Sequence, residues 1–178
     1  ALAGEGYLLL RPNKGAQAMP MDLARLRDFM MTAPLLLASA ARLASEHATD
    51  AQQQAMQARL DVLAAAQDSD NPRATALAAH GFWEELRDMA ASVYLAPSLT
   101  RLALDMTRLN EGHFAPGSKK ERKALKKTVQ AKQSIANAIA LQDAEAAVAA
   151  VLALWDASRD RLANAVQPAP LPTDLPDA

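Results

Sequence analysis

The side chains that most often carry catalysis or bind metals are few in this sequence, and their spacing fits no common site. The three histidines stand at positions 47, 80 and 113, and there is no cysteine. No two histidines are four residues apart, as two zinc ligands on one helix face would be. No serine lies in a G-x-S-x-G segment, the six glycines form no phosphate-binding loop, and no paired carboxylates converge on an apolar face. The sequence therefore predicts no catalytic residue, no cofactor and no enzyme.

Lys132 is the most unusual ionisable residue. It shares an apolar helical stripe with Leu125, Val129, Ile135 and Ile139. A buried ammonium group without a partner is unfavourable and tends to lose its proton. Two interpretations stay open: the ammonium reaches water while the stem packs, or it stands in a pocket and binds a ligand anion.

Two residues nearer the N-terminus are candidates for the pocket in which Lys132 could stand. Trp83 follows Phe82 and is either a core aromatic residue or a pocket wall that offers a flat apolar face and one N–H donor. His80 precedes Trp83 by about one helical turn and either faces the same pocket or lies satisfied at the surface. His47 and His113 fall at expected helix ends, and we interpret them as structural.

A run of six cations begins a predicted helix. Cations at a helix N-terminus oppose the helix dipole, so the run does not serve helix stability. It is either a solvated face or a contact for the phosphates of DNA or of a ligand. Its members are Lys119, Lys120, Arg122, Lys123, Lys126 and Lys127.

The composition is that of a helical protein. The 178 residues suffice for one domain, and 51% of them are hydrophobic but only 4% aromatic. The alanine and leucine that make up much of this content favour helices. The net charge of −1 gives no overall attraction to nucleic acid or to an anionic membrane. No apolar run approaches the roughly 18–20 residues of a membrane span, so we expect no membrane partner.

Capping signals and apolar spacing predict an all-α, antiparallel bundle of about six helices. Thr49 and Gln52 form a capping box, and Asn71 before Pro72 marks a helix start. Pro34 should kink or restart the first helix. Leu23 and Leu77 are expected among the residues of the buried stripes. The first two helices are expected at about 21–47 and 50–67. The third begins at 72 and ends at a break over 92–97, and the fourth runs from this break to about 109. The last two are expected at about 119–141 and 143–165.

Residues 1–19 differ from the bundle that follows. Residues 6–11 are apolar and β-prone, 12–15 have turn chemistry, and 16–19 return as a second strand of a β-hairpin. We expect a helical domain over 20–166 and a loose tail over 167–178, where four prolines stand. Because the chain starts within an element and without Met, we expect it to be part of a longer protein.

The order of these elements resembles the FadR-type branch of the GntR family of bacterial transcription regulators. In that branch a winged helix-turn-helix precedes a helical effector domain called FCD. The resemblance covers about residues 2–165. Two motifs belong to the wing: the L-x-x-E-G entry at 2–6 and the wing tip at 11–16. Three belong to the helical domain: the end of the first FCD helix at 40–44 with Thr49, the D-x-x-F-H-x-x-L segment at 82–86, and the junction before the last helix at 138–147.

The resemblance implies the effector-binding and dimerisation domain of a cytoplasmic regulator, together with the wing of its DNA-binding domain. It implies a homodimer whose effector, a small organic acid or an acyl-type compound, shifts the two DNA-binding heads. It also implies that the wing tip enters the minor groove of DNA. The residues placed there are Arg11, Asn13, Lys14 and Gly15.

Departures from the family pattern are informative. The family's usual metal ligands, one Asp and three His, correspond here to Ala79, Trp83, Lys132 and Leu154, none of which suits a metal. The family's R-x-x-x-E pair falls on Ala33 and Leu37, both apolar. The resemblance therefore predicts no metal. The alternative to a ligand sensor is a dimerisation scaffold whose pocket is filled. The predicted effector-binding residues are Lys132, Trp83, His80, Ala79 and Leu154.

Overall fold

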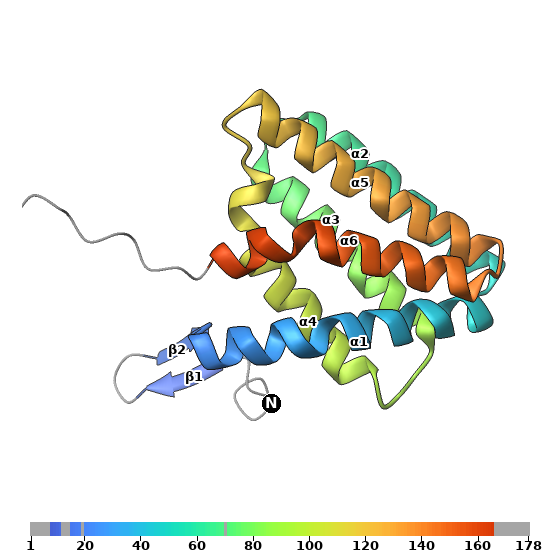
Figure 1. Cartoon of the computed structure of the whole chain (residues 1–178), viewed down its shortest axis with the longest axis horizontal. Coiled ribbons are helices and arrows are strands. Elements are labelled where there is room, and N and C mark those ends of the chain that lie inside the picture. Colours follow the sequence, from blue (N-terminus) through green and yellow to red (C-terminus); the bar gives the residue numbers. More distant parts are fainter. Residues whose placement is uncertain (1–7, 12–14, 19, 70, 166–178) are drawn as a thin grey trace, which may run out of the picture.

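The chain folds into an all-α bundle, as predicted (Figure 1). The computed structural model describes residues 8–11, 15–18, 20–69 and 71–165. The α-helices are α1 (Leu23–His47), α2 (Asp50–Asp68), α3 (Pro72–Ala90), α4 (Ala96–Leu109), α5 (Lys119–Ala140) and α6 (Ala144–Asn164), and a 3-10 helix, η1 (Glu111–Phe114), follows α4. None of the described helices combines the length and the apolar character that crossing a bilayer requires.

Side-chain caps fix several helix starts. Thr49 and Gln52 form the predicted capping box of α2, and the side chain of Asn71 caps α3. Ser118 and Glu121 form a second capping box at the start of α5, which was not predicted. The Glu121 carboxylate accepts hydrogen bonds from the backbone N–H groups of residues 117 and 118, which compensates part of the unfavourable charge run that follows.

α1 is one helix across Pro34 and does not restart there, because its buried face packs on α3 and α6, and this packing tolerates one missing backbone hydrogen bond. Two expectations about the buried stripes are wrong. Leu23 is 73% exposed because it is the first residue of α1, before the packed part of the helix. Leu77 is 61% exposed because it lies two residues from the buried Thr75 and Ala79, about 200° around the helix axis.

The helices form two layers (Figure 1). α6 lies between α1 and α5, and α3 lies behind them in contact with α1, α2 and α4. Phe29 of α1 packs on Trp155 of α6 with ring centroids 5.6 Å apart. A smaller apolar cluster, which includes Leu63 and Phe114, closes the other end of the bundle under α2 and α5. The polar end of α4 lies between these two apolar regions, and this arrangement positions the site described below.

Two strands precede the bundle. β1 (Leu8–Arg11) pairs antiparallel with β2 (Gly15–Ala18), so that Arg11 stands opposite Gly15. Of the residues predicted to contact DNA, Asn13 and Lys14 lie outside the described residues, and for Arg11 and Gly15 only the backbone is described. The tail predicted over 167–178 also lies outside the described part.

Candidate functional site

A cavity lies inside the bundle, where α3, α5 and α6 meet the end of α4 and η1. Its volume of about 30 Å³ is enough for one or two water molecules. The four positions to which the resemblance assigns metal ligands all line it, although they come from three helices. The structure thus brings together Ala79, Trp83, Lys132 and Leu154, as the sequence predicted.

Lys132 is enclosed by α3. Only 3% of its surface is exposed, and its Nζ donates a hydrogen bond to the carbonyl oxygen of Ala79 at 3.1 Å. The same atom lies 4.5 Å from the ring centroids of both Phe82 and Trp83, in cation–π geometry. Burial lowers the pKa of Lys132 to about 7. The interpretation in which the ammonium reaches bulk water is therefore wrong, because the ammonium is held inside the bundle by these three partners.

Arg161 is a second basic group at the cavity, and it was not predicted. Its Nε and Nη2 both donate to Oδ1 of Asn110, at 3.1 and 2.9 Å. The Nδ2 of Asn110 in turn donates to the carbonyl oxygen of Met106 at 2.7 Å, which fixes the orientation of the amide. Burial lowers the pKa of Arg161, but a guanidinium stays charged in proteins. Its charge therefore faces a neutral amide.

His113, which the sequence analysis interpreted as structural, also lines the cavity. Its Nε2 lies 3.1 Å from the hydroxyl of Thr128. Burial, and then the positive charges of Arg161 and Lys132, lower its pKa to about 4, so the imidazole is neutral at pH 7. His113 lies on η1, and because a single 3-10 turn leaves no periodic pattern in a sequence, its position at the cavity could not be predicted.

The charge balance of the cavity is one-sided. Lys132, Arg161 and His113 line it together with neutral hydroxyl and amide groups, and none of the described residues in its lining is acidic. Nor do three His, Cys, Asp or Glu side chains meet anywhere in the described part of the chain in a way that could hold a metal ion. The groups present are donors for an anion.

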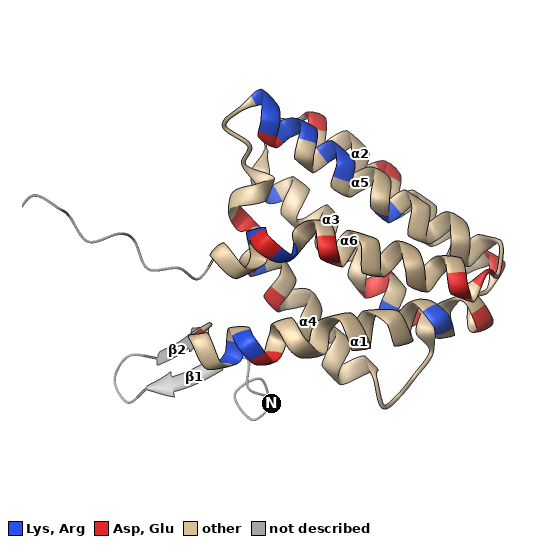
Figure 2. Cartoon of the chain, in the orientation of Figure 1, with Lys and Arg blue, Asp and Glu red and all other residues tan. Residues whose placement is uncertain are grey.

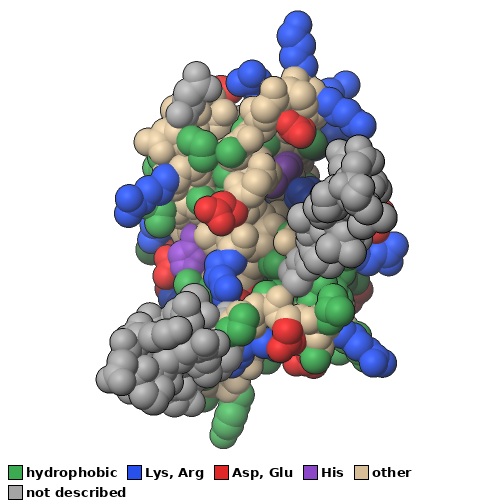
Figure 3. Space-filling model, turned by 90° about the vertical axis from the view of Figure 1, so that its left-hand side faces the viewer, with side chains coloured by type: hydrophobic (Ala, Val, Ile, Leu, Met, Phe, Trp, Pro, Cys, Tyr) green, Lys and Arg blue, Asp and Glu red, His purple; other side chains and the backbone are tan. Residues whose placement is uncertain are grey.

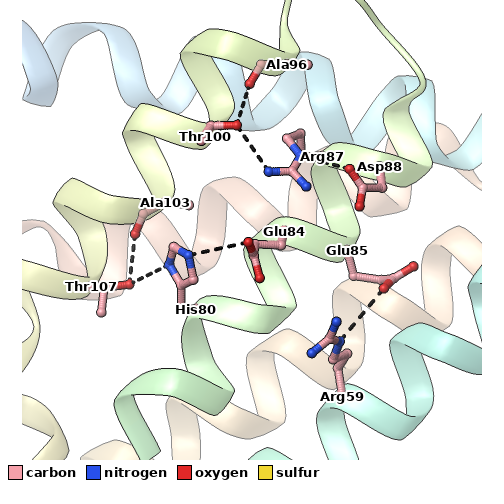
Figure 4. Close-up of polar contacts among 10 residues, drawn as sticks. All are labelled: Arg59, His80, Glu84, Glu85, Arg87, Asp88, Ala96, Thr100, Ala103 and Thr107. Carbon is pink, nitrogen blue, oxygen red and sulfur yellow. Dashed lines mark hydrogen bonds and ion pairs between the residues drawn. The ribbon is translucent and has the colours of Figure 1, made fainter. Parts of the chain in front are cut away.

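His80 does not line the cavity. Its Nδ1 lies 3.1 Å from the hydroxyl of Thr107, and its Nε2 lies 3.7 Å from Oε1 of Glu84 (Figure 4). Thr107 itself lines the cavity, so His80 stands behind it. Of the residues predicted to bind a ligand, His80 is thus the one that the structure sets apart.

The side chains of the basic run are solvent-exposed. They gather at the end of the molecule where α5 begins (Figures 2 and 3). Lys126 pairs with Asp68 of α2 at 3.1 Å between Nζ and Oδ1. Exposure suits a solvated face, and contact of the run with phosphates stays a prediction. Ala33 and Leu37, at the positions of the R-x-x-x-E pair, are buried in the apolar core.

The sequence matches a family model, and the fold is similar to those of solved structures. The model of the FCD domain matches residues 34–157. The fold is similar to that of E. coli McbR/YncC, with a TM-score of 0.75 and 15% identity over 92% of this chain and 80% of that chain. It is also similar to Streptococcus agalactiae GntR, with a TM-score of 0.65 and 18% identity over 89% of this chain and 77% of that one.

A third similar structure is that of Lar, which is described as controlling the expression of the Listeria monocytogenes agr system and mediating virulence. Its TM-score is 0.66 at 16% identity, over 92% of this chain and 74% of that one. No curated protein matches the sequence. At these identities the similar structures show the fold alone.

Proposed function

The chain belongs to the FCD-domain family of GntR-type transcription regulators, which are not enzymes, and from this premise we propose that its bundle binds an anionic effector in the cavity around Lys132. One observation carries the proposal. Ala79, Trp83, Lys132 and Leu154, to which the resemblance assigns metal ligands, line one cavity, and Lys132 is buried with no acidic partner in the described lining.

The effector is expected to meet Lys132 directly, without a metal between them. A charge-assisted hydrogen bond of this kind is worth about 1.5–3 kcal/mol. Trp83 would offer the ligand its indole face, while Ala79 and Leu154 would shape the apolar wall. About one Zn, Ni or Mn ion per purified chain in elemental analysis would contradict the metal-free part of this proposal.

The test is the variant Lys132→Met, which keeps the aliphatic stem and removes the charge. In a thermal-shift screen of organic acids and acyl-CoA-like compounds, it should bind roughly ten- to a hundredfold more weakly than the wild type. Lys123→Met is the matched control, because Lys123 is exposed on the same helix. A compound that stabilises the wild type and Lys132→Met equally would sink the proposal.

A dimerisation scaffold with a filled pocket is the second candidate function. The small volume of the cavity, about 30 Å³, favours it over a sensor of large effectors. A screen in which no compound stabilises the wild type would support this second function.

We further propose that the hairpin is the wing of the DNA-binding domain and that residues 20–166 form the effector domain. The pairing of Arg11 with Gly15 makes residues 12–14 the connection between the two strands, which supports a tip that carries Asn13 and Lys14. In this proposal Arg11, Asn13, Lys14 and Gly15 contact the minor groove and its phosphates.

A further inference from the structure

Two cationic side chains from different helices line the cavity, and their spacing in the sequence does not predict that they meet. Lys132 reaches it from α5 and Arg161 from α6, and burial is the cause of the lowered pKa of each. The partners of Lys132 are a carbonyl oxygen and two ring faces, and the partner of Arg161 is an amide oxygen. Each of these partners is uncharged, so the described lining supplies no negative charge to Arg161 or to the protonated form of Lys132.

Neutral polar groups complete the lining. Ser158 adds a hydroxyl group, and the neutral imidazole of His113 lies 3.1 Å from the hydroxyl of Thr128, which itself donates to the carbonyl oxygen of Ala124. An acceptor with several lone pairs and a negative charge could engage these groups together with both cations. An anion adds a Coulombic attraction and a bidentate hydrogen-bond geometry that the single oxygen of a neutral amide does not offer, so the guanidinium of Arg161 gains by exchanging Asn110 for an anion.

The size of the cavity restricts the ligand. Room for one or two water molecules accommodates a compact group and excludes an acyl chain or a nucleotide. We propose that the cavity binds one small oxyanion, held jointly by Lys132 and Arg161. This inference rests on the proposed function and narrows its effector to an inorganic oxyanion or a short carboxylate without an apolar body.

The test is calorimetric titration of the 178-residue chain at constant ionic strength. The probes are inorganic phosphate, sulfate and acetate, with chloride as the reference anion. At least one probe should bind saturably with a stoichiometry of one. Phosphate or sulfate alone would identify an inorganic oxyanion, and acetate alone a carboxylate. Failure of all three against chloride would overturn the inference, and this arm needs no folded variant.

Two variants test whether Lys132 and Arg161 both bind the anion. Lys132→Met and Arg161→Gln should each weaken binding of the probe by about tenfold or more. Arg159→Gln is the matched control, since Arg159 is exposed on the same helix as Arg161, and it should bind like the wild type. Arg161→Lys keeps the charge, so it should retain part of the affinity if Arg161→Gln folds poorly. Unchanged binding by a folded Arg161→Gln would overturn the role of the second cation.

The outcome also separates this inference from the proposed function. If a larger organic acid or an acyl-CoA binds through Lys132 while the three small anions do not, the inference fails and the proposed function stands. If no compound of either kind binds, both fail.

Discussion

At the scale of the residue, the burial of Lys132 couples stability to pH. In the folded chain its pKa is about 7, whereas an unfolded chain has the ordinary value near 10.5. Between these values the unfolded chain binds more protons, so the free energy of unfolding rises as pH rises from about 7 to about 10. The groups at the cavity wall that also carry or take up charge are Arg161, which does not titrate in this range, and His113, which is neutral throughout it.

We therefore predict that Lys132→Met lacks this rise. Urea denaturation at pH 7 and pH 10 should show a gain on the order of a few kcal/mol for the wild type and little change for the variant. At pH 7 the variant should be the more stable of the two, because it has no ammonium to desolvate. Lys123→Met serves as the control and should follow the wild type. Parallel pH profiles for wild type and Lys132→Met would show that Lys132 is not enclosed.

At the scale of the element, helices are predictable from the sequence where caps and apolar stripes mark them. Thr49 and Asn71 mark the starts of α2 and α3, and the apolar stripe of α5 is enough to single out Lys132. The rest of the site was out of reach. Arg161 and Asn110 are 51 residues apart in the sequence, and only the folded arrangement of α6 and the end of α4 brings them together. His80 was misassigned because helical spacing from Trp83 does not say which side of α3 faces the cavity.

The hairpin carries a prediction of its own. In a protein with the complete winged helix, Lys14→Ala should weaken binding about equally for all DNA sequences and lower the slope of log affinity against log salt by about 1, because one phosphate contact is lost. Fluorescence anisotropy over a salt series measures both. If Lys123→Ala gives this loss and Lys14→Ala does not, the contact belongs to the basic run of α5 and the wing assignment is wrong.

At the scale of the whole molecule, α1, α4 and the segment between α3 and α4 carry several exposed apolar side chains. Met31 and Leu35 of α1 are 64% and 69% exposed, and Val93 and Tyr94 just before α4 are 80% and 91% exposed. Leu104 of α4 adds to them at 38%. Exposed apolar side chains that form a contiguous patch mark interfaces between proteins, and we propose that a second copy of the chain covers those of α1 and α4.

Light scattering at micromolar concentration tests that arrangement. The wild type should have twice the mass of the chain, and Leu35→Glu should have the mass of a monomer, because two carboxylates would be buried at a two-fold interface. Leu141→Glu is the control, since Leu141 is 80% exposed at the C-cap of α5 and belongs to neither α1 nor α4. A monomeric wild type, or a dimeric Leu35→Glu, would refute the proposed face.

The placement of the two tryptophans gives this protein an optical readout. Trp83 lies 4.5 Å from the Lys132 ammonium, at the cavity wall, whereas Trp155 packs on Phe29 at the α1–α6 contact. A positive charge that appears, disappears or is neutralised beside an indole shifts its emission spectrum. We expect the fluorescence of Trp83 to follow both the protonation of Lys132 and the occupancy of the cavity, while Trp155 stays constant as an internal reference. Trp155→Phe would isolate the reporting ring, so that a titration needs no attached label.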